Sequence, residues 1–240
     1  MTETALPQAY ALCARGFDRP DETVEELLEA GSLAADLEHA GEALGLEETD
    51  ALVAAIPHPE ELRAGYAEAF GFERGGEVPL YEVSYSTKTL LTSTHDLADI
   101  AGFYRAFDLE LAADGRERVD HLCCELEFCA DLATREIALS RVEDEAGVAV
   151  VRDARRSFLE DHLGRWVPRL AETVREEVDL AVYRELAGFL EAVVAHDCEG
   201  LGAEPSVFPK SPPEPHADVL GGEGDFRCGT CGSGPIADEH

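Results

Sequence analysis

The most informative stretch of the chain for binding chemistry runs from Arg118 to Phe128, where Asp120, His121 and Glu125 lie close together. Asp120 is expected at the N-terminus of a helix, where its carboxylate could accept backbone N–H bonds and complement the helix dipole. His121 and Glu125 are four residues apart, so they would share one face of that helix and could form a pair. On physical grounds alone, a helix cap followed by a polar helix face is favoured over a binding site.

A second candidate is the loop Pro79–Tyr85, in which Tyr81 and Tyr85 flank the acid Glu82. The two rings could cover apolar residues of an extended peptide while Glu82 meets a cation. Alternatively, both rings simply fill space in the core of the protein. The residue types alone favour neither interpretation.

The third candidate is the pair Cys228 and Cys231, whose CxxC spacing suits a metal ion or a redox couple. A structural zinc site needs four ligands, and the chain has no second CxxC motif. Cys198, His196 and His216 could supply the missing ligands only if the C-terminal segment folded back. Three further cysteines fall within a predicted helix and are expected to be small buried apolar side chains: Cys123, Cys124 and Cys129.

Sequence motifs of common enzyme classes are absent. The chain contains no GxxxxGK[ST] phosphate loop, no GxGxxG following a strand, no HExxH and no GxSxG. We therefore expect a protein that binds another protein rather than an enzyme.

Acidic residues dominate the charged composition, with 51 Asp and Glu against 19 Lys and Arg and a formal net charge of −32. They are spread over the whole length, which predicts a uniformly acidic surface. Such a surface could attract a basic partner, or it could suit concentrated salt, where screening removes the repulsion among the acids. Dispersed acids, only two lysines and abundant alanine favour a halophilic, haloarchaeal-like source. The lack of a basic face argues against nucleic acid as a partner.

The sequence gives no sign of a membrane or of export. No stretch approaches the ~20 apolar residues of a membrane span, and residues 1–10 lack the basic start and apolar run of a secretory signal. Seven cysteines at irregular spacing do not suggest a disulfide framework. We therefore expect a cytoplasmic protein.

Apolar residues recur at helical spacing along most of the chain, which predicts an all-α fold. Asp21 can cap a helix that Gly31 ends, and Pro59 suits the first turn of another. Further helices are predicted from Ser32, from Ser93 or Thr94, over 120–142 and 150–163, around Trp166 and Leu170, and over 180–194. Only Val78–Thr89 has the composition of a strand. The expected architecture is a single bundle of roughly eight to ten helices over residues 1–200.

Residues 201–240 differ in character from the rest. Five prolines and little apolar content between Gly202 and Gly224 predict an extended tail. The tail ends in the small knuckle that carries the CxxC pair. The sequence therefore predicts one helical domain, 1–200, and a tail, 201–240.

The order of these motifs resembles that of the TorD/DmsD-type chaperones. The loop Tyr81–Tyr85 is similar to the family's tyrosine–glutamate loop, with valine in place of the serine that usually follows the glutamate. The run Val119–Leu122, followed by Glu125, is similar to a proline–aspartate–histidine motif, with Val119 in place of proline. Asp96–Phe107, Phe158–Leu163, Trp166 and Tyr183–Val194 resemble the family's other helices. The resemblance covers about residues 62–197, and the cysteine tail lies outside it.

The resemblance implies a chaperone that binds the twin-arginine signal peptide and the apo catalytic subunit of a molybdopterin oxidoreductase until its cofactor is inserted. Carboxylates beside aromatic surface suit two guanidinium groups next to an apolar stretch. The implied site is Tyr81, Glu82, Tyr85, Asp120, His121, Leu122 and Glu125. No cofactor is required, and a monomer and a domain-swapped dimer are both compatible with the sequence. The alternative is a metal-binding or redox protein that uses Cys228 and Cys231, with zinc as the possible metal.

Overall fold

The computed structural model describes residues 2–71, 78–86, 90–111 and 118–210, and these form an all-α bundle. The predicted fold class is thereby confirmed. The helices are α1 (Ala5–Phe17), α2 (Glu22–Glu29), α3 (Ser32–Leu44), α4 (Thr49–Ala54), α5 (Pro59–Ala69), α6 (Glu82–Tyr85), α7 (Leu90–Ala106), α8 (Leu122–Arg141), α9 (Glu145–Phe158), α10 (Gly164–Glu177) and α11 (Ala181–Leu201), preceded by a 3-10 turn, η1 (Thr2–Thr4). None of these helices is long and apolar enough to cross a membrane.

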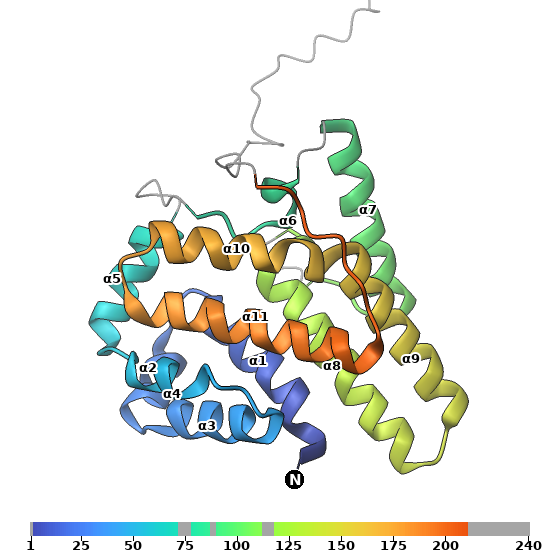
Figure 1. Cartoon of the computed structure of the whole chain (residues 1–240), viewed down its shortest axis with the longest axis horizontal. Coiled ribbons are helices and arrows are strands. Elements are labelled where there is room, and N and C mark those ends of the chain that lie inside the picture. The colour runs from blue at the N-terminus through green and yellow to red at the C-terminus, as the bar shows by residue number, and fades with distance from the viewer. Residues whose placement is uncertain (1, 72–77, 87–89, 112–117, 211–240) are drawn as a thin grey trace, which may run out of the picture.

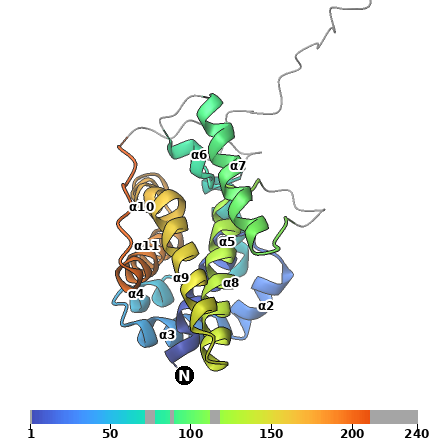
Figure 2. The same cartoon turned by 90° about the vertical axis from the view of Figure 1, so that its right-hand side faces the viewer.

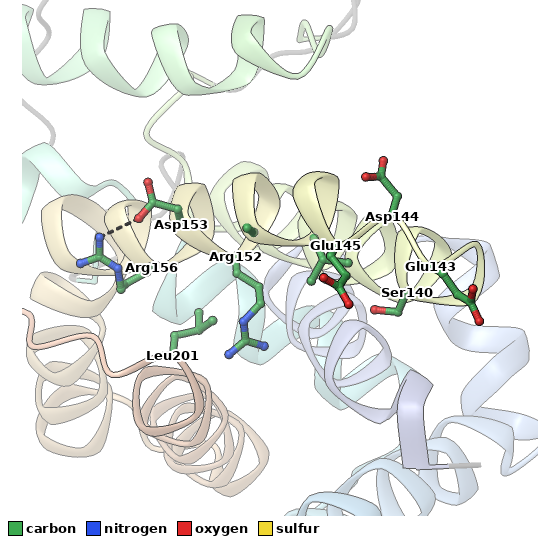
Figure 3. A pocket seen from close by; sticks show the side chains of 10 residues that line it. Ser140, Glu143, Asp144, Glu145, Arg152, Asp153, Arg156 and Leu201 are labelled. Carbon is green, nitrogen blue, oxygen red and sulfur yellow. Dashed lines mark hydrogen bonds and ion pairs between the residues drawn. The ribbon is translucent and has the colours of Figure 1, made fainter.

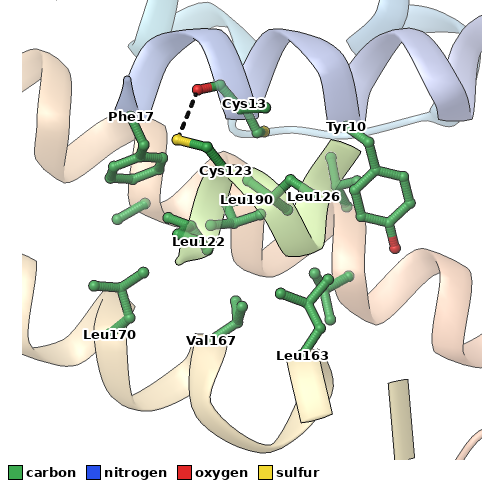
Figure 4. Close-up of a cluster of buried hydrophobic side chains, with 14 of the residues drawn as sticks. Tyr10, Cys13, Phe17, Leu122, Cys123, Leu126, Leu163, Val167, Leu170 and Leu190 are labelled. Atoms are coloured by element: carbon green, nitrogen blue, oxygen red, sulfur yellow. Dashed lines mark hydrogen bonds between the residues drawn. The ribbon is translucent and has the colours of Figure 1, made fainter. Parts of the chain in front are cut away.

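The core lies between α1, α8, α10 and α11, which pack against one another in the middle of the molecule (Figure 1). Figure 4 shows side chains from all four helices meeting there, and its labelled members are Tyr10, Cys13, Phe17, Leu122, Cys123, Leu126, Leu163, Val167, Leu170 and Leu190. Helix α1 contributes a full apolar stripe, although the sequence pattern predicts a first helix only from Asp21. Small residues such as Ala9 and Ala14 form part of that stripe, and their weak apolar signal explains the omission.

Several helix ends follow the local signals in the sequence. Asp21 caps α2, since its side chain accepts a hydrogen bond of 3.0 Å from the backbone N–H of Val24. Gly31 follows with a positive φ of 71°, and Pro59 occupies the first turn of α5. These ends were predicted correctly because each depends only on neighbouring residues.

Other helix ends differ from the prediction. Helix α7 begins at Leu90, three residues before Ser93. Helix α8 begins after His121, whose Nδ1 accepts a 3.3 Å hydrogen bond from the backbone N–H of Cys123. Asp120 is therefore not the N-cap, and its carboxylate is used elsewhere. The strand-like composition of Val78–Thr89 does not produce a strand in its described part. That part holds one bridged residue, Tyr81, followed by the single helical turn α6.

Helices α9 and α10 are joined without a break by a π-helical segment, Leu159–Leu163. Such a segment inserts one extra residue into a helical turn and is frequent at functional sites. Here it places His162 inside the protein, where its side chain is 3% exposed. Gly164 follows because a Cβ there would lie 2.6 Å from the Leu159 carbonyl oxygen.

Residues 202–210 run back along α10 as an extended segment (Figure 1). The backbone N–H of Phe208 donates to the Arg165 carbonyl at 2.9 Å, and the Phe208 ring is buried under the Arg165 guanidinium. Lys210 bonds Glu172 and Glu176 of α10. The described part of the predicted tail, residues 202–210, is thus extended and attached to the bundle. Residues 211–240, with Cys228 and Cys231, lie outside the described residues.

Candidate functional site

The two stretches singled out by the sequence, Pro79–Tyr85 and Arg118–Phe128, meet at one end of the bundle. Tyr81 and His121 form an antiparallel β-bridge. The backbone N–H of Glu82 donates to the Asp120 carbonyl at 3.0 Å, and that of Leu122 donates to the Leu80 carbonyl at 2.9 Å. Figure 2 shows the resulting position, with α6 beside α7 at the end of the bundle opposite α3. The structure thus brings the predicted site residues together.

Asp120 lies at the centre of this junction and is fully buried. Its two carboxylate oxygens accept hydrogen bonds from Arg118, from Nε at 2.9 Å and from Nη2 at 2.7 Å. The backbone N–H of Val83 donates to it as well, at 3.3 Å. The Arg118 guanidinium also lies over the Tyr81 ring, 4.6 Å from its centroid. On the same ring packs the imidazole of His121, with the two ring centroids 5.0 Å apart. We call Tyr81, Arg118, Asp120 and His121 the Asp120 cluster.

Glu82 is also buried, and its partner is a histidine 80 residues further along the chain. His162 Nδ1 lies 3.1 Å from Glu82 Oε2, and His162 Nε2 lies 3.3 Å from Asp99 Oδ2. Burial alone would lower the pKa of His162, but the carboxylates of Glu82 and Asp99 outweigh it and the pKa is raised. His162 Nε2 makes no hydrogen bond among the described residues, so its contact with Asp99 is electrostatic, and the two nearby carboxylates favour the imidazolium form.

Glu125 is the third buried carboxyl group. Its Oε2 accepts a 3.0 Å hydrogen bond from Trp166 Nε1, and among the residues that the structure describes no N–H or O–H donor reaches its Oε1. Burial raises the pKa of Glu125, and the nearby Glu82 carboxylate raises it further. A proton on Glu125 would give Glu82 a hydrogen-bond donor, whereas two ionised carboxylates would repel each other. We therefore assign Glu125 as the protonated partner of the pair.

The remaining predicted residues belong to the core. Tyr85 is buried, its ring lies 5.4 Å from the Trp166 ring, and its hydroxyl donates to the Pro79 carbonyl at 3.0 Å. Leu122 is fully buried. Of the two interpretations of the tyrosines, filling the core is therefore the one that fits Tyr85. Tyr81 is only partly buried and presents its ring to Arg118.

Four residues of the site were not identified from their own sequence environment. Arg118 and Trp166 lie in stretches that the sequence singles out, but neither side chain suggested a role there, and Asp99 and His162 lie in helices known only from the family resemblance. Their roles depend on contacts with residues between 2 and 80 positions away. Only Arg118 had a local signal, because an arginine two residues before an aspartate and next to a loop can form an ion pair with it.

Metal ligation is not supported by the part of the chain that the structure describes, where no group of three or more His, Cys, Asp and Glu side chains could hold an ion. Cys198 is buried at the end of α11 and His196 is exposed. Cys123 and Cys129 are buried, as expected, whereas Cys124 is half-buried. The proposed zinc or redox pair falls outside the described residues, so that expectation stays a prediction.

Comparison with known proteins gives consistent matches. Residues 31–172 match the family model described as nitrate reductase delta subunit. The selenate reductase assembly chaperone protein of Thauera selenatis is 33% identical over 195 residues, which cover 80% of this chain and 88% of that protein. The chlorate reductase assembly chaperone protein of Ideonella dechloratans is 35% identical over 45% of this chain and 54% of that protein. The chaperone protein TorD of Aliivibrio fischeri is 24% identical over 60% of this chain and 66% of its own length.

Proposed function

Because the chain belongs to the nitrate reductase delta subunit family, we propose that it is an assembly chaperone for a molybdopterin oxidoreductase of the DMSO, TMAO or nitrate reductase type. It binds the twin-arginine signal peptide and the apo catalytic subunit in the cytoplasm and assists cofactor insertion before export. The relatives named as assembly chaperones for selenate and chlorate reductases support this assignment. In this proposal the protein acts by binding and needs no cofactor of its own.

The observation that carries the proposal is the arrangement around Arg118. Its guanidinium is held by both oxygens of a buried carboxylate and covered by an aromatic ring. These are the two contacts with which proteins recognise arginine, a bidentate carboxylate and a stacked ring. The Asp120 cluster therefore already has the chemistry of an arginine-binding site, occupied by an arginine of its own chain.

We infer that an arginine of the signal peptide takes the place of Arg118. The Arg118 side chain is 32% exposed, whereas that of Asp120 is fully buried behind it. An external guanidinium can therefore reach the carboxylate only when the Arg118 side chain moves aside. The ring of Tyr81 would cover the incoming arginine as it now covers Arg118.

Glu82 is a second ionised carboxylate beside Asp120, whereas Glu125 is protonated and adds no charge. Glu82 is held by His162, so its charge is fixed in position, and Glu125 lies beside it. A carboxylate near a bound guanidinium favours its charge at short range even when salt screens distant charges. In this proposal Glu82 supports the Asp120 cluster without contacting the peptide.

The test is a calorimetric titration of a synthetic twin-arginine signal peptide, from a molybdenum reductase of the same organism, into the full-length protein. We expect saturable binding, which weakens when both arginines are lysine because lysine cannot form the bidentate pair. Asp131→Asn is the matched control for the variant Asp120→Asn and should not change the affinity for the peptide. Asp131 also pairs with an arginine, Arg135, that lies over an aromatic ring, but on another part of α8. Equal affinity for the arginine and lysine peptides would contradict arginine recognition.

A further inference from the structure

The Asp120 carboxylate can hold only one guanidinium at a time. Arg118 already bonds both of its oxygens, and the backbone N–H of Val83 donates to one of them. A twin-arginine peptide carries two adjacent arginines, and neighbouring side chains of an extended chain point to opposite sides. The second guanidinium therefore needs an acceptor of its own near the Asp120 cluster.

An exposed carboxylate lies on α7, the helix that packs beside α6 at this end of the bundle (Figure 2). The side chain of Asp99 is 52% exposed, whereas those of Glu82 and Asp120 are 3% and 0% exposed. Tyr104 holds α7 against the Asp120 cluster, because its hydroxyl donates to the Val119 carbonyl at 2.8 Å. Val119 immediately precedes Asp120. Asp99 is therefore a carboxylate that solvent, and hence a peptide, can reach.

His162 connects Asp99 to the buried carboxylate next to the cluster. Its Nε2 lies 3.3 Å from Asp99 Oδ2, and its Nδ1 lies 3.1 Å from Glu82 Oε2. The backbone N–H of Glu82 in turn donates to the Asp120 carbonyl at 3.0 Å. The imidazolium neutralises one of the two carboxylates, so one negative charge remains. Because Glu82 is buried, an incoming cation meets that charge at Asp99.

An aromatic ring accompanies this carboxylate. Phe103 follows Asp99 by four residues, so both side chains lie on one face of α7. The Phe103 ring is half-buried and packs edge-on against the His162 imidazole, with centroids 5.7 Å apart. A carboxylate and a ring are also the two contacts that hold the guanidinium of Arg118 in the Asp120 cluster. The same pair of groups therefore occurs a second time, on α7.

We propose that Asp99 and Phe103 bind one guanidinium of the twin-arginine peptide, while the Asp120 cluster binds the other. This assignment rests on the proposed function and gives each arginine a carboxylate and a ring of its own. Lysine at either position would lose the planar group that stacks and bonds in this way. The contact with Asp99 is half-exposed, so it contributes less to affinity than the buried Asp120 and depends more strongly on salt.

Acidic side chains alone do not provide this pair of contacts, as a groove on another part of the molecule illustrates. The groove has a volume of about 850 Å³ and is lined by the acidic residues 143–145 and Asp153, but none of the described residues that line it is aromatic. Figure 3 shows Asp153 paired with Arg156. Asp153 therefore matches Asp99 in being an exposed aspartate beside a basic side chain, but it lacks the ring. It offers the matched control.

The experiment titrates four versions of one synthetic signal peptide, with Arg-Arg, Lys-Arg, Arg-Lys and Lys-Lys at the motif, into the full-length protein at one salt concentration. Calorimetry gives the preference for arginine over lysine at each position. The wild type should prefer arginine at both positions, by about threefold or more. Asp99→Asn should abolish the preference at one position and keep it at the other. Asp120→Asn should do the reverse.

Two further variants complete the test. Phe103→Leu removes the ring but keeps an apolar side chain, so it should reduce the preference at the same position as Asp99→Asn. Asp153→Asn should bind all four peptides as the wild type does. Each preference is a ratio of two affinities of the same variant, so a partial loss of folded protein cancels.

The outcomes separate this assignment from the proposed function. The assignment alone is overturned if the wild type prefers arginine at both positions and Asp99→Asn keeps both preferences, or if Asp99→Asn and Asp120→Asn lose the same one. It is also overturned if the wild type prefers arginine at one position only. If the wild type binds all four peptides equally, or binds none, arginine recognition itself fails and the assignment fails with it.

Discussion

Arg118 and Asp120, two residues apart, form a bidentate ion pair in which the carboxylate is fully buried and the guanidinium reaches the surface. The side chain that holds Asp120 in this pair therefore has the same chemistry as the proposed ligand. If the signal peptide displaces Arg118, the two partners must have opposite effects on binding, which a purely structural ion pair would not produce.

The first prediction is that variants of Arg118 and Asp120 change the peptide affinity in opposite directions. Arg118→Gln should strengthen binding of the twin-arginine peptide by a few fold, because the internal competitor is gone and Asp120 is left without its bidentate partner. Asp120→Asn should weaken binding by about tenfold, because a charge-assisted contact becomes a neutral one. Calorimetric titration of each variant, beside a thermal melt, measures both effects.

Arg135→Gln serves as the matched control for Arg118→Gln, since Arg135 pairs with Asp131 and lies over the Phe107 ring. Its peptide affinity should not change. Weaker binding by both Arg118→Gln and Asp120→Asn, with lowered melts, would show that the pair only supports the fold.

A second prediction concerns His162 and pH. The raised pKa means that the folded protein binds this proton more tightly than the unfolded chain does. The stabilisation is therefore complete below the ordinary histidine pKa of about 6.5 and is lost as the pH rises through the folded value. At pH 6, His162→Gln should be destabilised by about 3 kcal/mol, because Glu82 keeps its burial but loses its charged partner. Above pH 6.5 the difference from the wild type should shrink.

Denaturant unfolding of both proteins between pH 5 and pH 9 measures that difference. Glu125 is present in both, so its own titration largely cancels. His39→Gln, at an exposed position on α3, should follow the wild type at every pH. A His162→Gln effect that stays constant or grows with pH would contradict an imidazolium between Glu82 and Asp99.

The sequence predicts best what neighbouring residues decide. Asp21 and Pro59 define helix starts because a cap and a missing N–H act within one turn. Asp120 looked like such a cap, but Arg118 and the N–H of Val83 compete for the same carboxylate, and His121 takes the capping position. Local propensity could not reveal this, because Val83 reaches Asp120 only through tertiary packing.

The composition of the candidate site was partly accessible, whereas its geometry was not. The family resemblance selected both stretches that meet at the Tyr81–His121 bridge. It did not indicate that most of the selected side chains are buried. Glu82 depends on His162, 80 residues away, and on a π-helical segment that no simple periodicity reveals.

The third prediction concerns the C-terminal segment. Deletion of residues 202–240 should leave the helical body folded, but with a lower melting temperature, because Phe208 no longer covers α10. Phe208→Ala in the full chain should cost about 3 kcal/mol for the same reason. Val207→Ala, at a neighbouring side chain that is 45% exposed, is the control and should change little. Thermal melts followed by circular dichroism test all three. Loss of cooperative unfolding in the truncated protein would show that the segment is required for the fold.

The last prediction concerns salt. A net charge of −32, spread over the chain, makes the compact state repel itself when the ionic strength is low. At molar salt the Debye length falls to about 3 Å, so repulsion between separated surface acids largely disappears while contacts as short as the 2.7 Å Arg118–Asp120 bond persist. Raising KCl from 0.1 M to 2 M should therefore raise the melting temperature, by about 4 to 8 °C if screening contributes about 2 kcal/mol.

A double variant, Glu26→Gln with Glu29→Gln on the exposed side of α2, should show a smaller rise because it has less repulsion to screen. Sucrose, which adds no ions, controls for general stabilisation by solutes. A melt that does not change between the two KCl concentrations would contradict the proposed adaptation to concentrated salt.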